Sequence, residues 1–197
     1  EFVSPVGDDL PVFTAGAHLD FHLDNGLIRS YSLANNPEES NRYVTAVLRE
    51  ETGGGGSKYM HDNVSIGDEL KVTGPSNNFE LADIPGTHIL LGGGIGITPL
   101  LAMGHKLKAE NRPRHLHYCT KSREETAFIE EVEEIFGDNL TFYHDGGDPS
   151  KGINLKETIG VQTKDANLYI CGPAGLLSAA RDVTSRWTVG SVHFELF

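Results

Sequence analysis

The spacing of hydrophobic and polar residues changes about 80 residues into the chain. Up to about Leu81, apolar residues alternate with polar ones in short runs, as in "HLDFHL", "RSYSL", "RYVTAVLRE" and "DELKVTG". This period of two is typical of strands. Turn-forming stretches such as "DNG", "NNP" and "GPSNN" separate the runs. The first part is therefore predicted to be a small antiparallel barrel or sandwich.

From "GTHILLGGG" onward, short apolar runs alternate with amphipathic segments of helical period. In one of these segments Leu100, Met103 and Leu107 recur at i, i+3 and i+7. Strands are predicted at "HILL", "HLHYC", "LTFYH", "ANLYICG" and "SVHFELF", and helices over 99–111, 123–136 and 173–186. Alternating strands and helices predict a doubly wound parallel sheet of order 3-2-1-4-5.

The change of period places a domain boundary in "DIPGT". We expect one domain over residues 1–83 and a second over 84–197. The run "TGGGGS" has the composition of a flexible linker, but it falls inside the first domain. Since the chain starts without methionine and stops abruptly on "SVHFELF", we expect both ends to be cuts in a longer polypeptide.

The composition limits the class of protein. The formal net charge of −12 argues against nucleic acid or an anionic membrane as a partner. No apolar run approaches the ~20 residues of a membrane span, and no signal-peptide pattern is present. Cys119 and Cys171 lie in apolar runs, which is typical of reduced cysteines in a cytoplasmic protein. The pair His115 and His117 lacks a third ligand at suitable spacing, so no metal site is predicted.

Glycines at two strand ends indicate a nucleotide site. "LLGGGIGITP" leads from a strand into a helix, with Thr98 expected as N-cap and Pro99 as the first helical residue. The fourth strand ends in "LYICGPAG", and strands one and four are neighbours at the switch point of this topology. The acid that usually binds ribose is absent, because the second strand is followed by Thr120, Lys121 and further non-acidic residues.

A second candidate site lies in the first part. On "RSYSL", Arg29 and Tyr31 share one face of a strand. Arginine offers a bidentate fork to a phosphate, and tyrosine offers a flat face to an aromatic ring. Gly55, Gly56 and Ser57 precede the expected helical turn "SKYMHD" and offer N–H groups and a hydroxyl to the same phosphate.

These motifs occur together and in order. "RSYSL", "GGS", "GPSNNF", "GGGIGITP", "CGPAGL" and "VHFELF" closely resemble those of the reductase components of Rieske-type oxygenases, the phthalate dioxygenase reductase and vanillate demethylase reductase group of the ferredoxin–NADP reductase superfamily. The resemblance covers essentially the whole chain. It implies an FMN-binding antiparallel barrel, incomplete at its N-terminus, followed by an NAD-binding α/β domain.

The resemblance also implies roles for particular residues. The residues implied to bind FMN are Arg29, Tyr31, Ser32, Val47, Leu48, Gly55, Gly56, Ser57 and Phe197. Those implied to hold NADH are Gly94, Gly96, Thr98, Thr120, Cys171, Gly172 and Pro173. As catalytic residues it implies Ser32 near flavin N5, Cys171 beside the nicotinamide, and Glu195 close by.

The implied function is transfer of hydride from NADH to FMN, with subsequent release of single electrons through a [2Fe-2S] centre to a Rieske-type oxygenase. Related chains carry that centre on a C-terminal domain with C-x₄-C-x₂-C, a spacing this sequence does not contain. Two alternatives stay open. The first is an FAD-dependent reductase using NADPH, in which Lys121 and Arg123 meet the 2′-phosphate. The second is a non-catalytic flavin- or nucleotide-sensing module.

Overall fold

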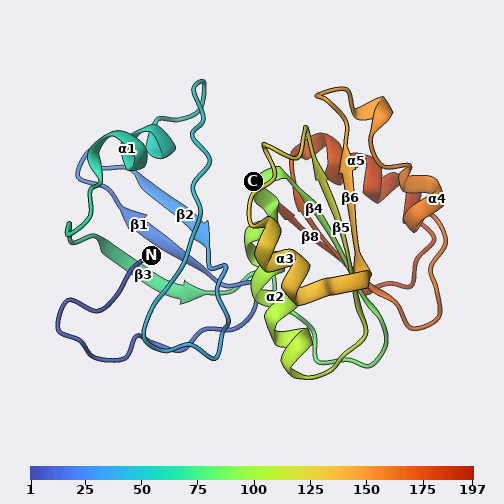
Figure 1. Cartoon of the computed structure of the whole chain (residues 1–197), viewed down its shortest axis with the longest axis horizontal. Coiled ribbons are helices and arrows are strands. Elements are labelled where there is room, and N and C mark those ends of the chain that lie inside the picture. Colours follow the sequence, from blue (N-terminus) through green and yellow to red (C-terminus); the bar gives the residue numbers. More distant parts are fainter.

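The computed structural model describes residues 1–197 and divides them between two sheets (Figure 1). In the N-terminal part, β1 (His18–His22) lies between β2 (Ile28–Ser32) and β3 (Lys71–Ser76) in an antiparallel sheet of order β2-β1-β3. Helix α1 (Gly56–Asn63) comes directly after the glycine run, so the predicted helical turn is confirmed. Three of the predicted strands are present at these positions.

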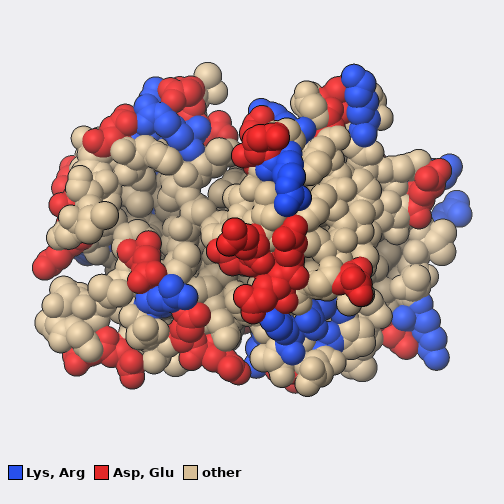
Figure 2. Space-filling view, viewed as in Figure 1, with Lys and Arg blue, Asp and Glu red and all other residues tan.

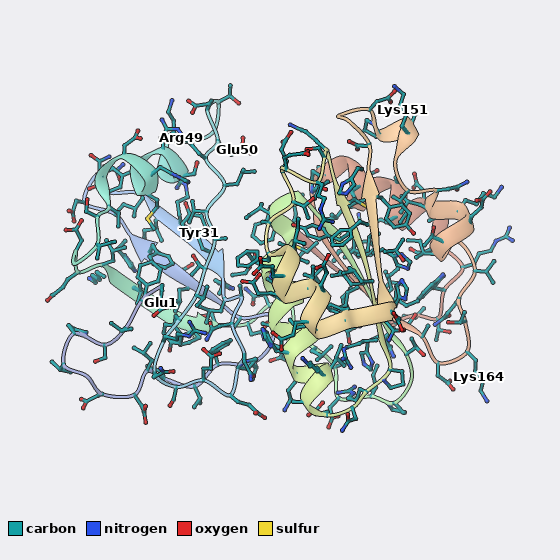
Figure 3. All side chains as sticks on the ribbon, in the orientation of Figure 1. Glu1, Tyr31, Arg49, Glu50, Lys151 and Lys164 are labelled. Carbon is teal, nitrogen blue, oxygen red and sulfur yellow. The ribbon has the colours of Figure 1, made fainter.

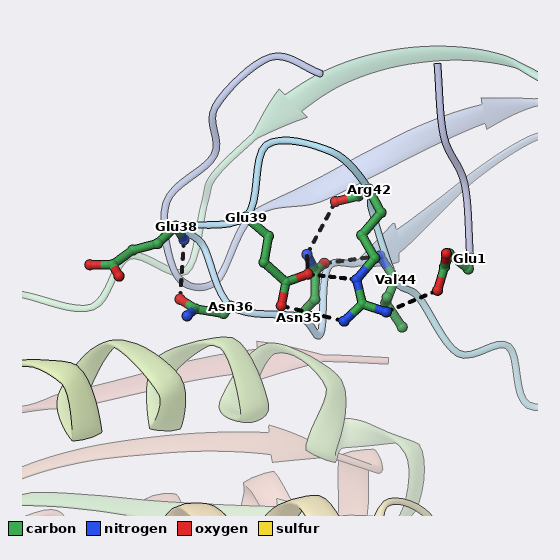
Figure 4. Close-up of polar contacts among 7 residues, drawn as sticks. All are labelled: Glu1, Asn35, Asn36, Glu38, Glu39, Arg42 and Val44. Carbon is green, nitrogen blue, oxygen red and sulfur yellow. Dashed lines mark hydrogen bonds and ion pairs between the residues drawn. The ribbon is translucent and has the colours of Figure 1, made fainter. Parts of the chain in front are cut away.

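The fourth prediction in this part, a strand over residues 42–50, is wrong. Tyr43 forms only an isolated bridge with Phe2. The neighbouring backbone bonds to a side chain, because Asn35 Oδ1 accepts from the Val44 N–H at 2.9 Å (Figure 4). The segment therefore gains no complete ladder of strand hydrogen bonds.

The rest of the same segment is also held by side chains. The Glu50 N–H donates to Ser57 Oγ at 3.0 Å, and His61 Nε2 lies 2.7 Å from the Val47 carbonyl oxygen. Val47 packs against the hydrophobic core while Leu48 is exposed. The alternation that suggested a strand thus reflects one core-facing side of an extended segment.

The second part is a five-stranded parallel sheet of order β6-β5-β4-β7-β8, as predicted. Its strands are β4 (His88–Gly93), β5 (Arg114–Thr120), β6 (Leu140–His144), β7 (Asn167–Gly172) and β8 (Val192–Leu196). Its helices are α2 (Ile97–Ala109), α3 (Ile129–Phe136), α4 (Leu155–Ile159) and α5 (Ala174–Val183). Helices α2 and α3 cover one face, and α4 and α5 cover the other (Figure 1).

Two helix starts differ from prediction. Helix α2 begins at Ile97 directly after a 3-10 turn over Gly94–Gly96, so Gly96 rather than Thr98 is the N-cap. Helix α3 begins at Ile129 rather than at residue 123, because Phe128 takes a left-handed conformation with φ of 59°. In both cases the helix start is set by the local backbone conformation, which the spacing of apolar residues does not reveal.

The two sheets share one hydrophobic core. A cluster of 25 buried residues runs from β1 through α2 to β7. At the junction, Phe79 packs edge-on against Tyr169 with ring centroids 6.1 Å apart. The Arg112 guanidinium donates to the carbonyls of Ala82 and Ile84 at 3.1 and 2.7 Å, which ties the connecting segment to the second sheet. We propose that the domain boundary lies here, at residues 83–84.

Charged residues are spread unevenly over the surface. Figure 2 shows acidic side chains gathered over the middle of the molecule, where α3 lies. The exposed carboxylates of α3 include Glu133 and Glu134, which pair with Arg123 at 3.6 Å and Lys108 at 3.0 Å. None of the helices is both long and apolar enough to cross a bilayer.

Candidate functional site

A cleft of about 1220 Å³ lies between the two sheets and is lined by residues of both. Tyr31 and Glu50 lie on the side of the N-terminal part that faces the second sheet (Figure 3). Ten of the residues expected at the site line the cleft. They are Arg29, Tyr31, Leu48, Gly56, Ser57, Gly94, Thr120, Gly172, Pro173 and Phe197.

One end of the cleft is built from Arg29 and the glycine run. The Arg29 guanidinium donates to the Gly54 carbonyl at 2.7 Å. A Cβ on Gly54 would lie 2.7 Å from Nη2 of Arg29, and one on Gly56 would lie 2.4 Å from its Cγ. A side chain at Gly56 would displace the stem of Arg29, and one at Gly54 would displace its guanidinium. The structure therefore brings Arg29 and the glycine run together, as the sequence suggested.

The same end presents the N-terminus of α1. Gly55 adopts a left-handed conformation with φ of 81°, and no side chain caps the helix. Uncapped N–H groups, a guanidinium and the Ser57 hydroxyl form a donor set that suits a phosphate. The residues present fit the phosphate group of a flavin nucleotide.

The residues expected beside a flavin ring divide into two groups. Tyr31 is half-buried, packs on Phe21 with ring centroids 5.6 Å apart and lines the cleft, as Leu48 also does. Ser32 is buried and Val47 faces the core, and neither lines the cleft. Sequence alternation could not place Val47, because its segment is not a regular strand.

Glycines bring the ends of β4 and β7 into close contact at the switch point. A Cβ on Gly96 would lie 2.3 Å from the carbonyl oxygen of Cys171. Gly94, Gly172 and Pro173 line the cleft beside this contact. Gly96 and Thr98 are buried and do not line it, and Thr98 Oγ1 donates to the Ile95 carbonyl at 3.1 Å. Gly96 and Thr98 therefore stabilise the turn between β4 and α2 and do not face the cleft.

Cys171 and Glu195 are directly opposite each other on β7 and β8. Burial raises the pKa of the Cys171 thiol, and burial raises the pKa of the Glu195 carboxyl to about 7. Glu195 Oε2 is buried without a hydrogen-bond partner. The terminal Phe197 is 46% exposed and lines the cleft. The structure thus groups Cys171 and Glu195 behind the cleft rather than in its wall.

Glu195→Gln is expected to change the pH dependence of stability. The pKa of Glu195 is about 7 in the folded chain, above its ordinary 4.5. The folded state therefore binds this proton more tightly, so the carboxyl favours folding below about pH 4.5, and that contribution is lost as the pH rises toward 7. Glutamine carries no charge, so the melting temperature of the variant should fall less than that of the parent from about pH 5 to about pH 8.

The control is Glu130→Gln, which changes an exposed carboxylate on α3. It should have the same pH profile as the parent. A Glu195→Gln profile parallel to that of the parent would show that this carboxyl keeps its ordinary pKa.

Apart from Thr120 and Lys121, the outer arm of the cleft was not predicted. It runs from Thr120 at the end of β5 across β6 to the segment 147–155, and includes Tyr143 and Asp145. Thr120 Oγ1 lies 2.7 Å from Thr126 Oγ1 and 2.9 Å from His144 Nδ1, so its hydroxyl is internally bonded. These residues do not form a recognisable motif. The only sequence feature that could have predicted the arm is the position of Tyr143 on the third strand of the parallel sheet.

Known proteins with the same architecture match the whole chain. A family model described as an oxidoreductase FAD-binding domain matches residues 7–81. The phthalate 4,5-dioxygenase oxygenase reductase subunit of Pseudomonas putida is 42% identical over 199 residues, covering 100% of this chain and 61% of that protein. The vanillate O-demethylase oxidoreductase of Pseudomonas sp. is 36% identical over 200 residues, covering 100% and 63%.

The solved structure of phthalate dioxygenase reductase superposes with a TM-score of 0.93 at 40% identity. The match covers 98% of this chain and 61% of that one. The chain therefore spans about three-fifths of the length of these relatives.

An antiparallel sheet and a doubly wound parallel sheet with a shared cleft define the two-domain fold of the ferredoxin–NADP reductase type. Within this class, the chain belongs to the family of phthalate dioxygenase reductase and vanillate O-demethylase oxidoreductase.

Proposed function

We propose that this chain binds FMN and NADH in the cleft and serves as the flavin reductase part of an oxygenase or demethylase system. The observation that carries the proposal is one continuous cleft. It joins the Arg29 and glycine-run pocket of the first sheet to the glycine-lined switch point of the second. Such a cleft lets a flavin nucleotide and a pyridine nucleotide meet at the boundary between the sheets.

The number of cations supports FMN over FAD. Arg29 is the one cationic side chain of the N-terminal part that lines the cleft. Nearby Arg49 pairs with Glu51 at 2.7 Å, and Lys58 pairs with the same carboxylate at 3.1 Å. A single guanidinium beside one helix N-terminus suits one phosphate group rather than a diphosphate.

The charges of the outer arm support NADH over NADPH. Lys121 lines the arm but lies 3.8 Å from the Glu125 carboxylate, and Arg123 pairs with Glu133 and does not line the cleft. Asp145 lines the same arm. A carboxylate at this position disfavours the extra 2′-phosphate of NADPH through like-charge repulsion.

The nucleotides supply the redox chemistry: a nicotinamide donates hydride, and a flavin accepts it and releases electrons singly. The protein binds and orients them. Arg29 and the α1 N-terminus hold a phosphate, Tyr31 offers a ring face, and Phe197 covers the cleft at the boundary. Ser32 and Cys171 are buried behind the cleft wall, and Glu195 lies opposite Cys171 on β8, so these residues support the wall from behind.

The relatives suggest where the electrons go once the flavin is reduced. The solved relative is described as a modular structure for electron transfer from pyridine nucleotides to [2Fe-2S]. We extend this to the present protein: its electrons would leave through a [2Fe-2S] centre to a Rieske-type oxygenase in the cytoplasm. An FAD- and NADPH-dependent reductase and a non-catalytic flavin-sensing module remain the alternatives for the test.

The test is a visible spectrum of the purified protein with mass analysis of the released flavin, and then anaerobic addition of NADH or NADPH. We expect a yellow protein that releases FMN and loses its absorbance with NADH faster than with NADPH. Released FAD, or faster reduction by NADPH, would favour the first alternative. A protein that binds flavin but is reduced by neither nucleotide would be the sensing module.

A further inference from the structure

We propose that Arg112 and Tyr169 are positioning residues for hydride transfer. By bonding to Ala82 they set the angle between the two sheets, and with it the distance between the two nucleotides. The proposal rests on the proposed function, because it takes both nucleotides to bind in the cleft. Neither Arg112 nor Tyr169 lines the cleft, and neither is among the residues expected at the site.

The hydrogen bonds between the two parts of the chain converge on one residue. Every hydrogen bond between residues 1–83 and 84–197 involves Ala82: its N–H donates to the Tyr169 hydroxyl at 3.1 Å, and its carbonyl accepts from Arg112 at 3.1 Å. The ion pair across this boundary, between Arg112 and Asp83 at 3.6 Å, involves an exposed carboxylate and contributes little. The other contacts are apolar packing in the shared core, which is not directional. The two bonds at Ala82 are therefore the directional contacts that fix how the sheets face each other.

The turn after α2 directs the Arg112 side chain toward the connecting segment. Directly before it, Asn111 takes a left-handed conformation with φ of 52°, so the chain leaves the helical path. Besides its bond to Ala82, Nη2 of Arg112 lies 2.7 Å from the Ile84 carbonyl oxygen and 2.9 Å from His88 Nε2. Because a guanidinium only donates, His88 Nε2 accepts. Burial and the charge of Arg112 lower the pKa of His88, which keeps the imidazole a neutral acceptor. The guanidinium thus joins the connecting segment to the start of β4.

Tyr169 is held firmly on β7. Its side chain is fully buried and stacks between the rings of His88 and His193, with centroids 6.1 and 4.5 Å apart at 16° and 7°. Phe79 of the N-terminal part packs edge-on against the same ring. The Phe79 N–H donates to Asn77 Oδ1 at 2.9 Å, and the Asn77 amide bonds to the loop before β1. The motif "GPSNNF" therefore fastens Phe79 to the first sheet, while Tyr169 fastens the residues that follow to the second.

A small rotation at Ala82 becomes a larger displacement at the cleft. The Arg112 contact lies beside His88, where β4 begins, whereas the cleft lies at the other end of this strand, at Gly93 and Gly94. The six residues of β4 span ~17 Å, so a rotation of about 3° about this point shifts one wall of the cleft against the other by ~1 Å. A misplacement of ~1 Å can lower a reaction rate about one-hundred-fold. The bonds at Ala82 therefore control the rate of hydride transfer without touching either nucleotide.

The chain provides a matched control for each residue. Arg114 is partly buried, as Arg112 is, and its Nη2 donates to the Ile135 carbonyl of α3 at 2.7 Å. All hydrogen-bond partners of Arg114 belong to the second sheet and its helices. Tyr43 is the control for Tyr169, because its hydroxyl donates to a backbone carbonyl within the N-terminal part. Replacing either control residue removes the same kind of bond without affecting the boundary between the sheets.

The experiment measures flavin reduction by NADH in a single anaerobic turnover of the flavin-loaded protein. At saturating NADH, Arg112→Met should lower the reduction rate by roughly ten- to one-hundred-fold. Tyr169→Phe should lower it by roughly three- to ten-fold, since Arg112 still bonds to Ala82. Arg114→Met and Tyr43→Phe should stay within about two-fold of the parent, and the dissociation constants of flavin and NAD⁺ should stay within about two-fold in all four variants.

Amide hydrogen exchange gives a readout that does not depend on turnover. Exchange over residues 79–84 should be faster in Arg112→Met and Tyr169→Phe than in the parent, and unchanged in both control variants. Tyr169→Phe keeps the stacked ring, so it tests the proposal even if Arg112→Met fails to fold. Reduction rates equal to that of the parent, equal losses in the control variants, or a loss explained by weaker nucleotide binding would overturn the proposal. A parent protein that binds flavin but is reduced by neither NADH nor NADPH would instead contradict the proposed function.

Discussion

Arg29→Ala should release the flavin while leaving the fold intact. A charge-assisted hydrogen bond to a phosphate contributes about 1.5–3 kcal/mol, so the flavin dissociation constant should rise by roughly ten- to one-hundred-fold. The loss of stability should be small, because the carbonyls that Arg29 contacts, those of Ile28 and Gly54, lie on exposed residues and can bond to water. The measurement is flavin fluorescence during titration of the flavin-free protein.

A nearby arginine serves as the control. Arg49 is exposed, pairs with Glu51 and Asp62, and does not line the cleft. Arg49→Ala should therefore keep flavin affinity within about two-fold, since exposed ion pairs contribute little. An Arg29→Ala protein that retains flavin as tightly as the parent would remove Arg29 from the phosphate site.

The second sheet could be predicted almost completely from sequence. Its strands are short apolar runs, and its helices have the 3.6-residue period, so Leu100, Met103 and Leu107 identify the buried side of α2 correctly. The sheet order agrees with the general topology of alternating strands and helices. The short helix α4 was missed, because five residues are too few for a helical period to be visible.

The first part was harder to predict because side chains replace the strand ladder. The bonds from Asn35, Ser57 and His61 to segment 42–50 join residues that are 7 to 14 positions apart. No local pattern encodes them. The candidate site shows the same division. Arg29 and Gly56 were found through a motif, whereas Tyr143 and Asp145 reach the cleft only because the sheet order brings β6 beside β5.

The glycine run after β4 is predicted to be a phosphate loop, and the structure shows a further requirement for glycine at Gly96, which lies against the end of β7. A Cβ at this position would lie 2.3 Å from Cys171 O, 2.5 Å from Cys171 C and 2.7 Å from Gly172 N. All three are backbone atoms, so no side-chain rotation can relieve the contact. Gly96→Ala must push the first turn of α2 away from the end of β7. We expect it to destabilise the protein by about 1–3 kcal/mol or more, as overpacking of a core does.

Gly96→Ala should weaken nucleotide binding as well as lower the stability of the fold. Gly94 and Gly172, which line the cleft, belong to the two backbone segments that would separate. The urea midpoint should therefore be lower, and NADH affinity should fall by at least about ten-fold. Flavin affinity should change little, because Arg29 and α1 belong to the N-terminal part. The matched control for stability is Gly175→Ala in α5, where a Cβ meets nothing within 4 Å. Alanine should stabilise that helix by up to about 1 kcal/mol. If the two variants had the same urea midpoint, the close approach of Gly96 to β7 would contribute nothing to the stability of the fold.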